Sequence, residues 1–341
     1  MDRLVVNGYG KYVGTRENQI VVKEKGKIIA YELAEKLRQV LITGRGSISF
    51  DAMNLLAENG VDLLVVDWKG EVKARLSSPS MRTVKTRREQ YYAYNDKRGV
   101  RISKNIALAK LRNQYAVLGT LAKRRKETKP ESAETLTQMR NEISAQIPVL
   151  EQIKSRTIDN ARETIMGVEG ICSSYYWRGF ASVIPEDFSF NDRSGRYARD
   201  PVNAMLNYGY GILRGEVWRA VHFAGLDPYG GFLHVDRPGR PSMVLDLMEE
   251  FRQHLVDKSV VRLITKRMVS PNDFALEQGL CKLSDSARKK LLSEILGKFE
   301  DYVRVGSNKM RWCDLIVKQA RDVAKYLRGE TTSYEGFYQR W

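Results

Sequence analysis

Residues 231–252 read GFLHVDRPGRPSMVLDLMEEFR: a glycine turn with a histidine, a proline-broken basic loop, and an apolar stretch that carries acids. The apolar second half predicts a helix that is at least half buried. Asp246, Glu249 and Glu250 stand at i, i+3 and i+4, which share one side of a helix. Buried carboxylates need a partner, a proton or a metal, so these acids with His234 predict a Mg²⁺ or Mn²⁺ site. The alternative is a solvated acidic face beside a structural histidine.

The charge of the chain points to a polyanionic partner. Its 341 residues carry a net charge of +16, and residues 82–129 alone hold fifteen basic and three acidic side chains. This favours nucleic acid as the partner, with a merely basic surface as the alternative. Three cysteines without a CxxC pair argue against disulfides or a zinc finger and predict a reducing cytoplasm. Neither an apolar run of about 18 residues nor a signal-peptide core occurs, so no membrane association is expected.

Residues 1–78 have the spacing of short β-strands. Apolar runs such as those at 4–6, 19–23 and 39–43 are separated by glycine, asparagine and charged turns. One short helix interrupts these runs, with Ser49 as its expected N-cap. Because no residue here has an evident catalytic role, we expect a small N-terminal β-sandwich-like domain for packing or dimerisation.

From about residue 86 the apolar period becomes helical and stays so almost to the C-terminus. Pro79, in the polar segment SSPS, marks the expected domain boundary. Predicted helices cover residues 102–121, 134–147, 150–177, 198–213, 215–224, 243 onward, 255–265, 284–303 and 311–328. Pro148 is expected to separate the second of these helices from the third. The sequence therefore predicts an α+β protein, in which a larger all-α catalytic domain at 86–341 follows the β domain.

Two further stretches carry candidate functional residues. Glu169 lies late in a long helix between Gly167 and Gly170, and two helical glycines at about 1 kcal/mol each indicate a position that needs room. The alternative is an exposed acid between two packing contacts. Asp200 and Pro201 form a strong helix start. Three arginines precede it in a Gly/Ser loop and predict a phosphate-binding site: Arg193, Arg196 and Arg199.

Four motifs occur in an order and at separations that resemble one protein family. They read VEG with YYW at 168–177, DPVNAMLNYGYGIL at 200–213, LDPYGGFLH at 226–234 and SMVLDLMEEFR at 242–252. Together they resemble the CRISPR-associated integrase of the spacer-acquisition module, the first of the numbered CRISPR-associated proteins. The resemblance covers the whole chain, because the β-then-α layout matches as well.

The resemblance implies a site for one Mn²⁺ or Mg²⁺ ion and assigns its residues. Glu169, His234 and Glu249 are the implied ligands, and Asp246 is implied to be needed for activity. Glu250 matches no family role and is expected to be a surface acid. Six arginines near the implied chemistry are expected to contact DNA: Arg193, Arg196, Arg199, Arg237, Arg240 and Arg252.

The implied reaction inserts a short DNA fragment into a CRISPR array by transesterification, in which a terminal 3′-hydroxyl attacks a phosphodiester. The metal would stabilise charge on the phosphate oxygens. His234 is expected to bind this metal or, alternatively, to act as general acid for the leaving oxygen. A structure-specific nuclease that cuts branched DNA without joining it would use the same site. A DNA-binding scaffold with a structural ion, or with none, is the second alternative.

The resemblance also implies partners. Homodimers are expected to form through the β domain, and two dimers to bridge a small ferredoxin-like CRISPR-associated protein. DNA is expected both as donor fragment and as repeat target, and phosphate contacts should make its binding salt-sensitive. The basic residues of 82–129 would contact the DNA backbone away from the chemistry.

Overall fold

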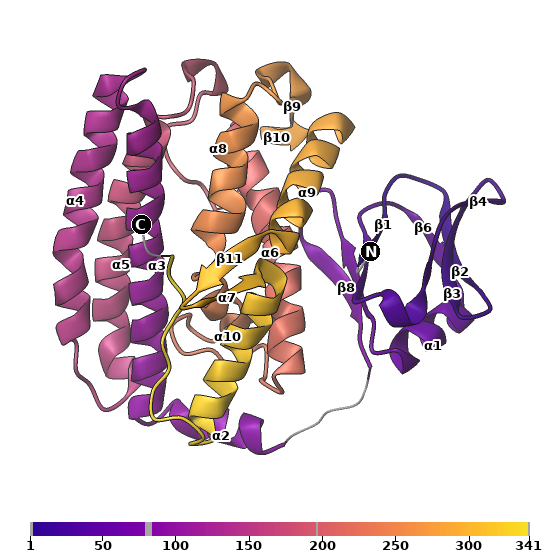
Figure 1. Ribbon diagram of the computed structural model, residues 1–341, viewed down its shortest axis with the longest axis horizontal. Helices are drawn as coiled ribbons and strands as arrows, with labels where there is room; N and C mark the ends of the chain where they lie inside the picture. Colours follow the sequence, from indigo (N-terminus) through magenta and orange to yellow (C-terminus); the bar gives the residue numbers. More distant parts are fainter. Residues whose placement is uncertain (1–2, 79–83, 196, 340–341) are drawn as a thin grey trace. The chain divides into compact units, whose positions relative to one another are not determined.

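The computed structural model describes residues 3–78, 84–195 and 197–339, and it divides the chain into two compact units, Met1–Arg82 and Thr83–Trp341. The first unit is rich in strands and the second is mostly helical (Figure 1). This confirms the predicted α+β class. Pro79, the expected boundary residue, lies outside the described residues.

In the described residues 3–78 of the first unit there are eight strands and one α-helix. Their bounds are β1 Arg3–Val6, β2 Lys11–Arg16, β3 Gln19–Glu24, β4 Lys27–Leu33, β5 Gln39–Ile42, β6 Gly46–Ile48, α1 Phe50–Glu58, β7 Asp62–Val66 and β8 Val72–Leu76. One four-stranded sheet has the order β1-β5-β7-β8, and the other has the order β4-β3-β2-β6. β1, β5 and β7 run parallel and β8 antiparallel, whereas β2, β3 and β4 form a meander to which β6 adds in parallel.

Apolar side chains from both sheets and from α1 form the core of this unit. Ile20, Val40 and Leu56 are among its fully buried members. The helix begins as the sequence predicts, because the Ser49 hydroxyl accepts a hydrogen bond from the backbone N–H of Ala52 at 3.1 Å. The strands β5 and β7 are buried along most of their length, which explains their unbroken apolar runs in the sequence.

The second unit contains nine α-helices within the described residues and two short hairpins. The helices are α2 Lys85–Ala93, α3 Lys97–Arg125, α4 Pro130–Gln152, α5 Ile158–Ala181, α6 Pro201–Phe223, α7 Ser242–Met248, α8 Lys258–Thr265, α9 Asp285–Glu300 and α10 Trp312–Leu327. The hairpins are β9 Phe274–Glu277 with β10 Leu280–Leu283, and β11 Tyr302–Val305 with β12 Asn308–Arg311. The helical periodicity predicts most of these helices but neither hairpin. No described helix is long and apolar enough to cross a membrane.

Two predicted helix breaks are wrong. α4 continues through Pro148 to Gln152, because a proline near a helix end removes only one hydrogen bond. α6 continues through Arg214 and Gly215 as one helix, whereas two separate helices, 198–213 and 215–224, were predicted. Leu213 and Val217 on either side are fully buried, and their packing outweighs the glycine cost of about 1 kcal/mol.

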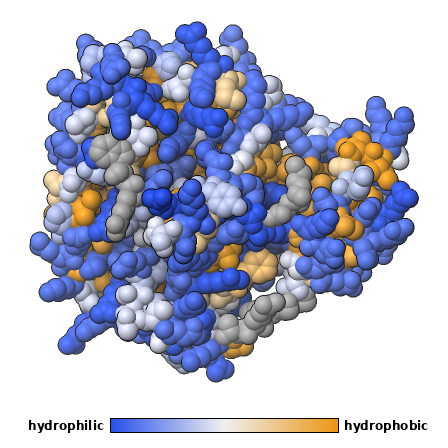
Figure 2. Space-filling view, viewed as in Figure 1, coloured by the Kyte–Doolittle hydropathy of each residue, from blue (hydrophilic) through white to orange (hydrophobic). Residues whose placement is uncertain are grey.

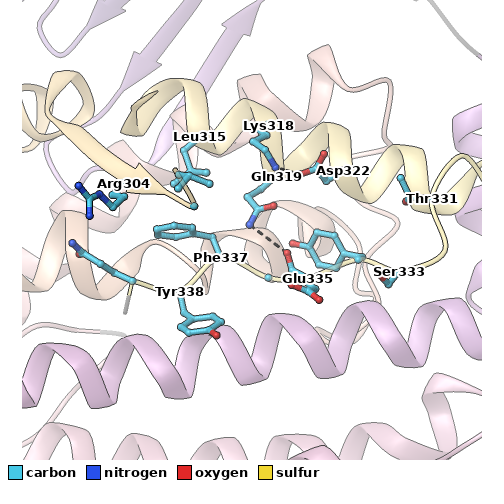
Figure 3. A pocket seen from close by; sticks show the side chains of 15 residues that line it. Arg304, Leu315, Lys318, Gln319, Asp322, Thr331, Ser333, Glu335, Phe337 and Tyr338 are labelled. Carbon is cyan, nitrogen blue, oxygen red and sulfur yellow. Dashed lines mark hydrogen bonds and ion pairs between the residues drawn. The ribbon is translucent and has the colours of Figure 1, made fainter. Parts of the chain in front are cut away.

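Helices α3, α4 and α5 lie side by side. The C-terminal tail, residues 331–339, returns along α3 (Figure 1). The Nδ2 of Asn105 donates a hydrogen bond to the backbone carbonyl oxygen of Tyr334 at 2.5 Å. The Nδ2 of Asn113 donates to the backbone carbonyl oxygen of Phe337 at 3.0 Å. On its other side the tail lines a groove of about 880 Å³ against α10, where Gln319 faces the tail (Figure 3). The tail is therefore part of the helical core.

A buried carboxylate lies at the centre of this unit. A π-helical turn, Gln253–Asp257, joins the chain after α7 to α8. Asp257 is fully buried and accepts hydrogen bonds from the hydroxyls of Tyr210 at 2.5 Å and Tyr176 at 2.8 Å. Burial nevertheless raises the pKa of the Asp257 carboxyl to about 6, although both hydroxyls act to lower it.

We predict that this carboxyl makes stability depend on pH. Its folded pKa of about 6 lies above its ordinary value of 3.8, so its stabilising effect is complete below pH ~4 and is lost as pH rises through 6. A shift of about two units corresponds to about 3 kcal/mol. Between pH 4 and pH 7, the free energy of unfolding measured in urea should fall by about 3 kcal/mol more for wild type than for Asp257→Asn. The variant keeps all other titrating groups and so controls for them. If the difference in unfolding free energy between wild type and variant stays the same at every pH, the prediction is contradicted.

Candidate active site

One buried carboxylate attaches the glycine turn to α7. Asp246 in α7 is fully buried, and its Oδ2 accepts hydrogen bonds from the backbone N–H groups of Phe232 at 2.6 Å and Leu233 at 2.9 Å. Its Oδ1 accepts from the backbone N–H of His234 at 2.8 Å and from the ring Nδ1 of that residue at 2.7 Å. Both oxygens are thus engaged with the turn, which makes Asp246 a positioning residue for His234.

This contact orients the imidazole ring. With Nδ1 donating to Asp246, the ring turns Nε2 toward Glu249, whose Oε1 lies 4.0 Å away, and in the neutral tautomer this nitrogen carries the lone pair. Gly231 lets the turn approach α7 closely, since a Cβ there would lie 2.5 Å from the Cβ of Ser242. The glycine of the GFLH motif is therefore required by packing.

Glu169 and Glu249 reach the same ammonium group from different helices. Glu169 lies in α5, Glu249 directly follows α7, and Lys110 lies in α3. The Nζ of Lys110 forms an ion pair with Oε1 of Glu169 and another, at 2.7 Å, with Oε2 of Glu249. The Ser173 hydroxyl donates to the same Glu169 oxygen at 2.8 Å. With His234 beside Glu249, all three predicted ligands lie in one cluster.

Positive charges keep the most buried acid of the cluster ionised. Burial alone would raise the pKa of the Glu249 carboxyl, but nearby cations outweigh burial and lower the pKa to about 2. Arg252 is the strongest of these, with Nη2 3.0 Å from Oε1 of Glu249, and Lys110 is the next. Burial would likewise lower the pKa of Lys110, yet the two carboxylates raise it. Glu249 and Lys110 are therefore both charged at neutral pH.

The donor set of this cluster fits a divalent cation. Within the described parts of the chain, no three His, Cys, Asp or Glu side chains lie close enough to enclose an ion as they stand. The two carboxylates nevertheless meet on one cation, the Lys110 ammonium, and an imidazole nitrogen lies 4.0 Å from one of them. Carboxylates with one imidazole suit Mn²⁺, and carboxylates alone suit Mg²⁺. Glu169, His234 and Glu249 are the residues that would hold such an ion.

Lys110 is the site residue that sequence reasoning misplaces. Among the basic residues of 82–129 it is expected to contact DNA away from the chemistry, but it lies between two of the predicted ligands. A signal does exist, because Ile106 and Gln114, one turn before and one turn after it, are both buried. A lysine on the buried face of a helix requires a buried counter-charge.

The arginines predicted to contact DNA differ in their surroundings. Arg199 and Arg237 are exposed. Arg240 is half-buried, with Nη1 3.5 Å from the backbone carbonyl oxygen of Val235. Arg196 lies outside the described residues. Arg252 reaches into the cluster, so it is the arginine with a direct contact to a predicted ligand.

Arg193 is turned toward the protein. Its Nη1 donates to the side-chain oxygen of Asn203 at 2.9 Å, and its Nη2 donates to that of Asn207 at 2.6 Å. Both asparagines lie on α6, so the loop before the helix is fastened to the helix itself. These bonds favour a structural role for Arg193.

Glu250 is buried, so the expectation of a surface acid is wrong. The backbone N–H of Phe337 donates to its Oε2 at 2.8 Å, and the hydroxyl of Tyr334 donates to its Oε1. Burial raises the pKa of the Glu250 carboxyl to about 8. Glu249 and Glu250 are adjacent in the helical turn that follows α7, about 100° apart around its axis, so they contact different neighbours.

Comparisons with known proteins identify the family of this chain. The family described as CRISPR associated protein Cas1 matches residues 4–296. The chain belongs to the Cas1 family. CRISPR-associated endonuclease Cas1 1 of Archaeoglobus fulgidus is 48% identical over 345 residues, covering 99% of this chain and 100% of that protein. CRISPR-associated protein Cas1 3 of Methanobrevibacter ruminantium is 34% identical over 340 residues, covering 99% and 100%.

Solved structures share the fold. A casposase bound to integration product has 25% sequence identity and a TM-score of 0.81, covering 98% of this chain and 93% of that one. A Cas1 protein from Thermotoga maritima has 17% identity and a TM-score of 0.78, covering 99% and 100%. The Cas1 resemblance drawn from the four motifs is therefore confirmed.

We predict that Asp246→Asn destabilises this Cas1 protein and disables its site. The amide offers one acceptor oxygen where the carboxylate has two, so buried backbone N–H groups of the turn lose their partner. The expected loss in the free energy of unfolding is about 2–4 kcal/mol, measured by urea unfolding. Asp322→Asn, which breaks a surface ion pair with Lys318, should cost less than about 1 kcal/mol. Equal stabilities of the two variants would show that Asp246 does not anchor the turn.

Proposed function

We propose that this Cas1 chain is a metal-dependent DNA integrase that inserts short DNA fragments into a CRISPR array. The observation that carries the proposal is the cluster of Glu169, His234 and Glu249, drawn from three segments of a chain with a net charge of +16. The similarity to a casposase whose structure holds an integration product supports joining of DNA over cutting alone.

A bound Mn²⁺ or Mg²⁺ would stabilise the charge that develops on the phosphate oxygens during transfer. In the joining step, the 3′-oxygen of the donor forms a bond to the target phosphorus, and the bond from phosphorus to the target 3′-oxygen breaks. The attacking hydroxyl gives up its proton and the leaving oxygen takes one, so phosphodiester bonds are conserved. Glu169 and Glu249 supply carboxylate ligands, and Asp246 keeps Nε2 of His234 turned toward them.

A strand-joining assay tests this proposal. Fluorescent donor DNA is incubated with a supercoiled plasmid that carries a repeat, with Mn²⁺ or with chelator. We expect label in the plasmid only with metal, and a loss of at least about 100-fold in His234→Ala. His222→Ala is the matched control, because the ring of His222 meets the ring of Phe223 edge-on, with centroids 6.0 Å apart, and takes no part in the cluster. Nicking without label transfer would favour the nuclease alternative, and DNA binding without either product would favour the scaffold.

The same variant separates the two roles considered for His234. If Nε2 is a metal ligand, His234→Ala binds Mn²⁺ more weakly than wild type, which electron paramagnetic resonance of free Mn²⁺ measures. If Nε2 serves only as general acid, Mn²⁺ affinity is unchanged while joining is lost. The first outcome is expected, because the bond from Nδ1 to Asp246 is the arrangement that orients ligand histidines.

We predict that the exposed arginines supply phosphate contacts. Arg199→Ala and Arg237→Ala should each weaken DNA binding and reduce the slope of log affinity against log salt by about 0.9. Fluorescence anisotropy at several salt concentrations measures this slope. Lys289→Ala, which removes an exposed charge from α9, is the control and should leave the slope unchanged. A slope unaffected by either arginine substitution would remove that residue from the interface.

The first unit is proposed to form a homodimer. β4 is one of the two edge strands of its sheet, and it exposes Ile28 by 43%, Ile29 by 50% and Tyr31 by 65%. Figure 2 shows a hydrophobic patch where Figure 1 places this strand. An edge strand with exposed apolar side chains is suited to pairing with another chain. A second copy is the proposed occupant, and membership of the Cas1 family supports a small ferredoxin-like CRISPR-associated protein as further partner.

A further inference from the structure

Tyr210 connects the buried Asp257 carboxylate to the cluster of predicted ligands. Its ring lies in α6 and is 7% exposed, and its hydroxyl donates to Oδ1 of Asp257 at 2.5 Å. Tyr176 donates to the other oxygen of Asp257 at 2.8 Å. The phenol of Tyr210 is therefore fixed at its polar end by a carboxylate that is itself held by a second hydroxyl.

The face of the same ring contacts the arginine that reaches the site. The Cζ of Arg252 lies 4.7 Å from the centroid of the Tyr210 ring, and its Nη2 lies 3.0 Å from Oε1 of Glu249. Arg193 approaches the same ring, with Cζ 5.3 Å from the centroid. Stacking on an aromatic face suits the planar guanidinium of arginine and restricts a long side chain that would otherwise sample many rotamers.

Packing alone does not explain this arrangement. Phenylalanine would fill nearly the same volume without requiring a buried carboxylate, whose desolvation is costly even when it is hydrogen-bonded. The hydroxyl fixes the rotation of the ring, and a fixed ring fixes the guanidinium that stacks on it. The feature that gains from this rigidity is the end of Arg252 beside Glu249, where phosphate would approach.

We propose that Tyr210 is a positioning residue that holds Arg252 beside Glu249 for contact with a DNA phosphate. The proposal rests on the proposed DNA integrase function and extends it to a residue that touches neither DNA nor metal. Asp257 contributes to this positioning, because its carboxylate fixes the hydroxyl of Tyr210. The chemical group recognised is a phosphodiester of the DNA that enters the site.

The test is a double-mutant cycle in DNA binding, which requires no catalysis. Arg252→Ala, Tyr210→Leu and the double variant are titrated with a fluorescent duplex carrying 3′ overhangs, at several salt concentrations and with chelator present. Arg252→Ala should reduce the salt slope by about 0.9, as expected for one phosphate contact. Tyr210→Leu should give a similar reduction although it removes no charge, and the double variant should equal Arg252→Ala. An unchanged slope in Tyr210→Leu, or additive effects in the double variant, would overturn the proposal.

Conservative variants separate positioning from general damage to the core. Tyr210→Phe keeps the ring and should retain more of the slope than Tyr210→Leu. Tyr176→Phe also removes one hydrogen bond from Asp257 but does not touch Arg252, so it should keep the wild-type slope. A loss in Tyr176→Phe equal to that in Tyr210→Phe would assign the effect to the core and not to Arg252.

A replacement variant and one further outcome distinguish a failure of the Tyr210 proposal from a failure of the proposed integrase function. If Tyr210→Leu does not fold, Arg252→Lys replaces it, because lysine keeps the charge and loses the planar face. A wild-type slope in Arg252→Lys would overturn the positioning role. If wild type binds DNA but joins no strands, integration fails while the cycle in binding still decides the role of Tyr210.

Discussion

The buried carboxylate of Asp246 is the contact on which the rest of the site depends. α7 has only seven residues, and a helix this short has little stability of its own in water. Its position therefore comes from tertiary contacts, of which the hydrogen bonds between Asp246 and the turn 232–234 are the most concentrated. His234 and Glu249 both take their positions from this attachment. The same set of hydrogen bonds therefore places the imidazole and the carboxylate together.

Charge balance explains why basic side chains lie among the predicted ligands. A carboxylate as buried as that of Glu249 stays ionised only beside compensating charge, which Lys110 and Arg252 provide. With a pKa of about 2, this carboxylate has no bound proton that a divalent ion would have to displace near neutral pH. Adding such an ion makes the cluster more positive, and a positive, partly buried cluster attracts the phosphate of an incoming DNA strand.

The parts that sequence predicts are those whose signals are local. The Ser49 cap and the helix start at Asp200 each depend on residues three positions apart, and the structure has both. The contacts that sequence misses join distant positions. Lys110 meets a glutamate 59 residues away, and Glu250 meets a tyrosine 84 residues away, so no local pattern identifies either partner. The predicted ligands could be grouped from sequence because the family resemblance already combines such distant positions.

The helical segment after Met248 presents its side chains to three neighbours. Successive residues of a helix point about 100° apart, so Glu249 and Glu250 face different directions, whereas Glu249 and Arg252, at i and i+3, stay within reach of one another. The backbone N–H groups of Glu249, Glu250 and Phe251 bond to the third carbonyl before each, and a π-helical turn follows. Glu249 turns to the ligand cluster, Glu250 to the C-terminal tail, and Arg252 lies between Glu249 and the ring of Tyr210. π-Helical turns cost backbone regularity and recur at functional sites, and the last residue of this one, Asp257, accepts the hydrogen bond from the hydroxyl of the same Tyr210 ring.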